Sequence, residues 1–206
     1  MKQAIALLIT AMATVWTGAA RTAADFFAAA PAEAVPLLKA NTRLDMLDYY
    51  NSGLPTASDN SLGGRSRITA LSDNALTVEL SRDATLQLAV VPAGRDTVVA
   101  VIETIRTPMA DSGIRLYRAS DWRELPAPAL PGVREFAPAD MRKNMKTGDS
   151  DGIFFVRAEY EPESGLFRFT DTTAAYYTDA DRPESLKKLR PNITMRLSKG
   201  RFIENK

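Results

Sequence analysis

The chain has 206 residues with 26 basic and 25 acidic side chains, and it contains neither histidine nor cysteine. The absence of these two residue types excludes Ser-His-Asp and Cys-His catalysis, thiol redox chemistry, disulfides and ordinary zinc or copper sites. Carboxylate chemistry, Ser-Lys pairs, oxygen-ligated cations and binding without catalysis remain.

The first 20 residues have the three parts of a secretory signal peptide. Lys2 supplies a positive start, an apolar run covers residues 4–15, and Gly18 and Ala20 are small at the positions that signal peptidase reads. The run is shorter than the roughly 20 apolar residues of a membrane anchor. We therefore expect cleavage after Ala20 and export to the periplasm, the outer surface or the medium, rather than a first helix or an anchor.

The remaining chain, residues 21–206, is expected to form a single domain. Removing Lys2 from the 26 basic residues leaves 25, equal to the 25 acidic ones, so the mature chain has no net charge. Because no dense basic run is present either, a nucleic-acid partner is not expected. No second apolar stretch approaches membrane length, so no transmembrane segment is expected in the mature chain.

The mature chain begins with helical sequence and continues with strands. Two helices are expected within residues 22–50, and Thr42 and Asp45 form a capping-box pattern in the second. From Arg65 the apolar period changes to two, with turn signals about every 10 residues, as in an antiparallel meander. The expected strands cover residues 65–70, 76–80, 86–90, 97–104 and 114–117. Residues 97–104 are almost continuously apolar, which predicts a central strand buried on both faces.

Four prolines lie in the longest irregular stretch, residues 126–140, which crosses a sheet edge or links two lobes. A hairpin of residues 153–161 and 166–172 follows, then a short helix over 182–189 with Asp181 as its cap. Residues 193–197 form the last full strand, before a short final pair that turns at 199–200. These elements predict an α+β domain: N-terminal helices on a large, curved antiparallel sheet of about eight strands, with a half-barrel as one form it could take.

Three short segments match the motifs of penicillin-binding proteins and serine β-lactamases. Residues 185–188 fit S-x-x-K, residues 72–74 fit S-D-N, and residues 146–148 fit K-T-G. The order is wrong, because S-x-x-K comes last, and the chain is short for that fold. We interpret these as chance matches.

Other candidate chemistry is equally weak. Asp149 and Asp151 suggest a calcium loop, but the EF-hand register places Thr147 at the first ligand position and Ala158 at the twelfth. The glutamates at 159, 161 and 163 suggest a carboxylate pair, yet their spacing fits the wet face and tip of a hairpin. We therefore predict no catalytic residue, no metal site and no cofactor.

Three segments carry a family resemblance: residues 60–66 (NSLGGRS), 111–117 (DSGIRLY) and 121–125 (DWREL). In this order they resemble a family of small exported proteins from Bacteroidales, which is classed as a domain of unknown function. The resemblance extends to residues 27–31, 37–38 and 49, and it implies a source and a compartment but no activity. Physically, Asp111 and Ser112 are expected to form a turn into a strand, and Trp122 to anchor the chain to the core.

The function predicted from these features is that of a non-catalytic exported protein that binds an envelope protein, lipid or glycan on the concave face of its sheet. The alternatives are a carrier resembling periplasmic lipoprotein carriers, with an acyl chain under the helices, and an envelope-polymer hydrolase using Ser-Lys or carboxylates. Aromatic pairs could stack on sugars, although such side chains are more often part of the core. The candidate ligand-binding residues are Tyr49, Tyr50, Asp111, Tyr117, Trp122, Tyr176 and Tyr177.

Overall fold

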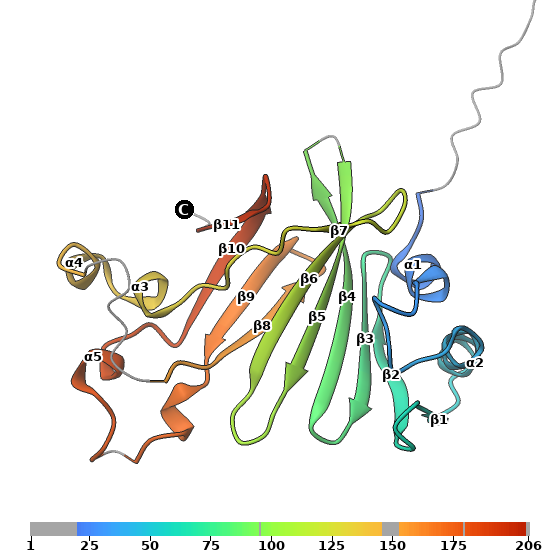
Figure 1. Ribbon diagram of the computed structural model, residues 1–206, viewed down its shortest axis with the longest axis horizontal. Helices are drawn as coiled ribbons and strands as arrows, with labels where there is room; N and C mark the ends of the chain where they lie inside the picture. The colour runs from blue at the N-terminus through green and yellow to red at the C-terminus, as the bar shows by residue number, and fades with distance from the viewer. Residues whose placement is uncertain (1–19, 95, 146–152, 179, 205–206) are drawn as a thin grey trace, which may run out of the picture.

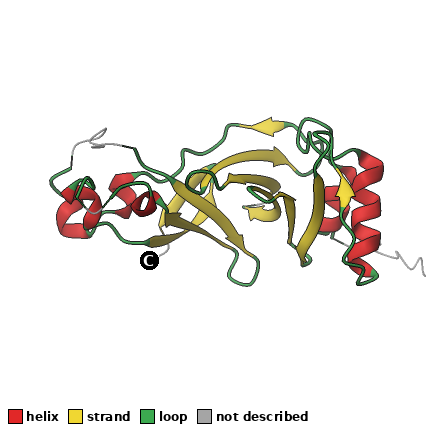
Figure 2. Ribbon diagram, turned by 90° about the horizontal axis from the view of Figure 1, so that it is seen from below, coloured by secondary structure: helices red, strands yellow, loops and turns green. Residues whose placement is uncertain are grey.

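The computed structural model describes residues 20–94, 96–145, 153–178 and 180–204. Two antiparallel sheets form the middle of the molecule, with helices α1 and α2 at one end and α3, α4 and α5 at the other (Figures 1 and 2). The predicted α+β class, with N-terminal helices on a large curved antiparallel sheet, is confirmed, and the sheet remains unclosed.

The first sheet has seven strands, which neighbour one another in chain order. They are β1 (Ser58–Asp59), β2 (Arg65–Leu71), β3 (Ala75–Ser81), β4 (Ala84–Ala93), β5 (Asp96–Ile105), β6 (Asp111–Arg118) and β7 (Glu124–Leu125). The second sheet has four strands in the order β11-β10-β9-β8. They are β8 (Val156–Glu161), β9 (Leu166–Asp171), β10 (Asn192–Ser198) and β11 (Arg201–Glu204).

Helices α1 (Ala23–Ala29) and α2 (Ala40–Asn51) cover one face of the seven-stranded sheet. A capping box starts α1: the Thr22 amide donates to Asp25 Oδ2 at 2.7 Å, and the Asp25 amide donates to Thr22 Oγ1 at 3.3 Å. The expected box at Thr42 and Asp45 does not form, because α2 begins at Ala40 and both residues lie inside the helix.

Strand β5 is buried on both faces, as its apolar sequence predicts. Val99 and Val101 pack with the helices, whereas Val98, Ala100 and Ile102 pack toward the second sheet. The seven-stranded sheet is therefore a middle layer between helices and the four-stranded sheet.

The expected single sheet of about eight strands is in fact divided at β8. Three side chains of the first sheet bond to alternate amides of β8 where a neighbouring strand would otherwise pair. The Val156 amide donates to Asp111 Oδ1 at 3.1 Å, the Ala158 amide to Ser112 Oγ at 2.9 Å, and the Tyr160 amide to Gln87 Oε1 at 2.7 Å. Because side chains satisfy these donors, β8 is held against the first sheet without extending its ladder.

The stretch between the sheets contains the short helices α3 (Val133–Phe136) and α4 (Ala139–Arg142). Helix α5 (Glu184–Lys187) is shorter than expected, and its N-cap is Pro183 rather than Asp181. The Asp181 carboxylate instead accepts a 2.6 Å hydrogen bond from the Thr178 hydroxyl, which closes a separate turn. The expected final pair is formed by β10 and β11.

Candidate binding site

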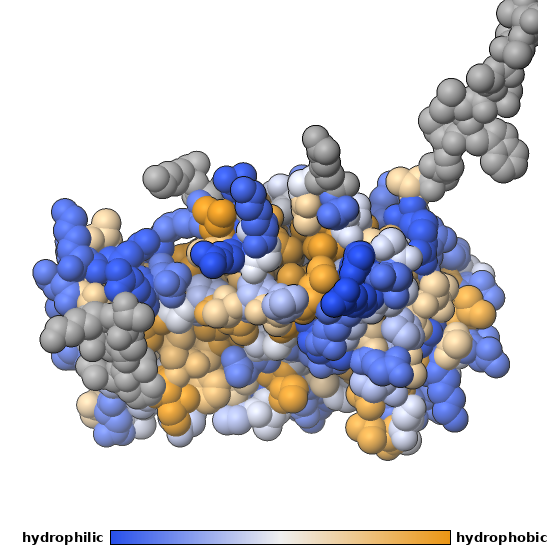
Figure 3. All heavy atoms as spheres, turned by 45° about the horizontal axis from the view of Figure 1, so that its top comes forward, coloured by the Kyte–Doolittle hydropathy of each residue, from blue (hydrophilic) through white to orange (hydrophobic). Residues whose placement is uncertain are grey.

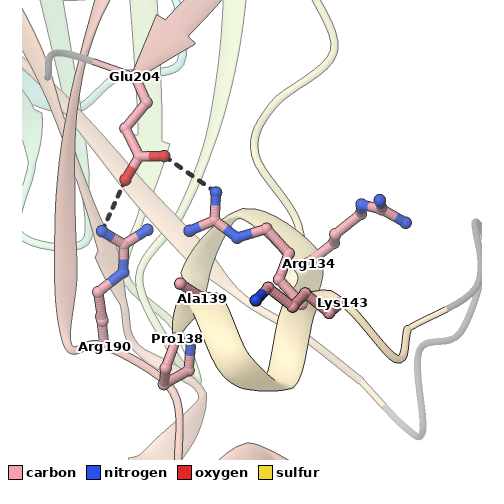
Figure 4. A pocket seen from close by; sticks show the side chains of 7 residues that line it. Arg134, Pro138, Ala139, Lys143, Arg190 and Glu204 are labelled. Atoms are coloured by element: carbon pink, nitrogen blue, oxygen red, sulfur yellow. Dashed lines mark hydrogen bonds and ion pairs between the residues drawn. The ribbon is translucent and has the colours of Figure 1, made fainter.

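A hollow of about 550 Å³ lies between α4 and the C-terminal strand β11. Segments far apart in the chain supply its lining, which consists of Arg134, Pro138, Ala139, Arg142, Lys143, Arg190 and Glu204. Figure 4 shows this site from close by. Four basic side chains against one carboxylate give the lining an excess of three positive charges.

Local structure places the basic side chains of α3 and α4. Gly132 precedes α3, and its amide donates to Glu135 Oε2 at 2.9 Å, which fixes the start of the helix. Pro138 then caps α4, where its fixed φ suits the first turn. Arg134 in α3 and Arg142 in α4 thereby reach the same hollow, and Lys143 follows directly after α4.

Glu204 lies between two arginines. Its Oε1 accepts a 2.7 Å hydrogen bond from Arg190 Nη1, and its Oε2 accepts a 3.0 Å bond from Arg142 Nη1 (Figure 4). The bond from Arg190, followed by the bond from Arg142, lowers the pKa of Glu204 below its ordinary value of 4.5. The carboxylate is therefore ionised near neutral pH and bridges the two guanidinium groups.

Backbone carbonyl groups hold both guanidinium groups in place. Arg190 Nη2 donates to the Glu135 carbonyl at 2.6 Å, and Arg142 Nη2 donates to the Ala137 carbonyl at 3.1 Å. The Arg190 amide also bonds to the Phe136 carbonyl at 2.9 Å. The donors that face Glu204 are therefore preorganised, so an anion bound here would not have to order them.

Arg134 and Lys143 carry the remaining positive charge of the hollow. Arg134 Nη1 donates to the Met145 carbonyl at 3.1 Å, and in the part of the chain that the structure describes neither residue forms an ion pair. Hydrophilic side chains also gather on the surface over this end of the molecule (Figure 3). The hollow therefore has the chemistry of an anion-binding site.

The two tyrosine pairs predicted from the sequence lie in different places, and neither lines this hollow. Tyr49 and Tyr50 end α2, where Tyr50 lines a separate hollow of about 330 Å³ with Met46. Tyr176 and Tyr177 follow β9, with ring centroids 5.1 Å apart, and the Tyr177 hydroxyl accepts from the Ile153 amide at 3.0 Å. Tyr50 and Tyr176 remain exposed, so both pairs stay candidates for stacking.

The other predicted residues make contacts within the fold. Asp111 bonds to β8, and Tyr117 is buried, which raises its pKa, while its hydroxyl accepts from Arg115 Nη1 at 2.9 Å. Trp122 packs against the rings of Phe26 and Tyr117, with centroids 6.0 and 5.7 Å away. The sequence-based view of Trp122 as an anchor to the core agrees with these contacts.

The Ser-Lys arrangement is not assembled by the residues that the structure describes. Asn74, beside Ser72, donates to the Pro162 carbonyl at the turn of the β8–β9 hairpin. Helix α5 lies near the opposite end of this hairpin, away from the turn, where Arg182 pairs with Asp171 at 3.5 Å. The two ends of the hairpin are about 17 Å apart, because each of its strands has six residues, so the S-D-N and S-x-x-K segments are not brought together. The K-T-G match at 146–148 and the calcium-loop aspartates at 149 and 151 lie outside the described residues.

Buried apolar side chains of α1, α2 and the seven-stranded sheet pack against one another. Phe27, Leu38 and Leu76 are each at most 1% exposed there. The carrier alternative, with an acyl chain under the helices, stays a prediction. Within the described ranges, no three acidic side chains form a group that could hold a metal ion. Across the same ranges, every helix is too short or too polar to cross a membrane.

Sequence reasoning missed two arginine-based features. The basic hollow has a partial signal in the closely spaced Arg134, Arg142 and Lys143, but no pattern links them to Arg190. The other feature is Arg43, which is only 3% exposed and donates to the carbonyls of residues 28, 30 and 38 at 3.3, 2.5 and 2.7 Å. Arg43 thus joins the end of α1 to the start of α2.

The fold and the hollow define a class: an α+β protein of two antiparallel sheets with a basic surface site. The chain belongs to the family described as "Protein of unknown function (DUF3256)", whose model matches residues 16–202. It is also similar to the solved structure of a domain of an uncharacterized protein from Porphyromonas gingivalis W83. That similarity has a TM-score of 0.68 at 18% identity, covers 88% of this chain and 96% of that one, and concerns the fold. No curated protein matches the chain.

Proposed function

We propose that this chain is an exported, non-catalytic binding protein that takes an anionic group of an envelope component in its basic hollow. The observation that carries the proposal is the excess of basic side chains around a hollow of about 550 Å³, with two guanidinium groups already fixed in direction. Fixed donors in a concave site favour binding, because little side-chain entropy is lost when the ligand arrives.

Export is the second part of the proposal, and it comes from the sequence. The leader pattern of the first 20 residues and the resemblance to small exported proteins of Bacteroidales both favour an envelope location. Expression of the full chain in a bacterial host, followed by mass measurement of the purified product, tests it. A product that begins at Arg21 supports export, and a product that retains residues 1–20 contradicts it.

The binding test uses the mature chain and a double charge reversal, Arg134→Glu with Lys143→Glu. Both residues line the hollow, and the ion pairs of Glu204 in the described chain are with Arg142 and Arg190 instead, so the arginine bridge is preserved. Exposed Arg82, in the turn between β3 and β4, supplies the matched control Arg82→Glu. The ligands are a hexaglutamate peptide, an acidic polysaccharide and vesicles that contain an anionic phospholipid.

We expect the double variant to bind its preferred anion at least about tenfold more weakly than wild type, with a smaller salt dependence. The Arg82→Glu control is expected to match wild type. Equal binding by wild type and the double variant, or no binding of any of the three anions, would contradict the proposed function.

A further inference from the structure

We infer that Glu204 is an internal ligand of the basic hollow, and that the external ligand is an acidic peptide whose carboxylate replaces that of Glu204. This inference rests on the proposed function and specifies its ligand. Glu204 ends β11, a short strand at the edge of the four-stranded sheet, so its side chain enters the hollow from an extended backbone.

The two guanidinium groups match a carboxylate. Each oxygen of Glu204 receives one N–H, from Arg190 on one side and from Arg142 on the other. A planar group with two oxygens satisfies both donors at once, and glutamate or aspartate side chains present that group. A phosphate has further oxygens, for which this pair of fixed donors provides no partners.

Glu204 is also placed so that it can be exchanged. Its side chain is 35% exposed, and β11 pairs with β10 alone, over four residues. A carboxylate that leaves this site can be hydrated, so releasing it costs far less than releasing a fully buried one. Lys143 and Arg134 lie around the same hollow and would attract the acidic residues next to the incoming carboxylate.

The test compares wild type with Glu204→Gln and Glu204→Asp for binding of a fluorescent hexaglutamate peptide. Glu204→Gln removes the competing charge, and Glu204→Asp keeps the charge on a side chain one methylene shorter. Glu161→Gln is the matched control, because Glu161 also ends a strand of the same sheet and pairs with an arginine, Arg168. Urea unfolding of each variant establishes that it is folded during the titration.

We expect Glu204→Gln to bind the peptide about five- to tenfold more tightly than wild type, because the internal competitor is gone. Glu204→Asp should lie between the two, and Glu161→Gln should match wild type. If Glu204→Gln binds no more tightly, while wild-type binding still depends on Arg134 and Lys143, the proposed exchange of carboxylates is wrong and the proposed function stands. If only the vesicles or the polysaccharide bind, the peptide assignment is overturned. If Arg134 and Lys143 do not affect any binding, the proposed function itself fails.

Discussion

The junction of the two sheets gives the sharpest prediction about stability. Ser112 Oγ accepts from the Ala158 amide at 2.9 Å and lies 2.8 Å from Thr104 Oγ1. All three residues are buried, with exposed fractions of 7%, 1% and 5% for Ser112, Ala158 and Thr104. Replacing Ser112 by alanine leaves a buried amide and a buried hydroxyl without their partner, and water has little access to either.

An unsatisfied buried donor costs about 1–3 kcal/mol, so we expect Ser112→Ala to lower the free energy of unfolding by about 2 kcal/mol. For a chain of this size that corresponds to a fall in Tm of about 4–8 °C. Thr104→Val should cost less, about 1 kcal/mol, because Ser112 still accepts from the Ala158 amide. The double variant should lose less than the sum of the two, since both substitutions disrupt one network.

Urea unfolding followed by tryptophan fluorescence measures these values, because Trp122 is the only tryptophan outside the expected leader. Hydrogen exchange at the Ala158 amide reports the junction directly, and Ser112→Ala should accelerate it more than exchange in β5. An unfolding free energy within about 0.5 kcal/mol of wild type, with the Ala158 amide still protected, would refute the view that side chains hold β8.

Three further predictions concern single side chains. Arg43→Met should lower the unfolding free energy by about 2–4 kcal/mol, because three carbonyls lose a buried donor, and urea unfolding would show the loss. Trp122→Ala should cost about 2–3 kcal/mol through lost packing on Phe26, measured as a fall in Tm. The lowered pKa of Glu204 stabilises the fold above pH 4.5, and this contribution is lost as the pH falls through the folded-state value. Because Glu204 is partly exposed, the unfolding free energy of wild type should exceed that of Glu204→Gln by only about 0.5 kcal/mol at pH 7, and this difference should vanish near pH 2. Urea unfolding at both pH values would show this.

Local pattern in the sequence determined the class of fold and most of the elements. The alternation after Arg65 predicts the meander, and the continuous apolar run at 97–104 predicts a strand buried on both faces, as β5 is. These predictions succeed because side-chain period and burial are properties of a few consecutive residues. The exclusion of histidine and thiol chemistry follows from composition alone.

Only the tertiary structure decided the division into two sheets and the location of the basic hollow. No local pattern indicates that Asp111, Ser112 and Gln87 bond to the amides of β8, because each contact joins segments far apart in the chain. The same reason hides the hollow, where Arg142, Arg190 and Glu204 come together from three separate segments. In the sequence these are scattered charges on a chain whose net charge is only +1, and the fold alone brings them together around one site.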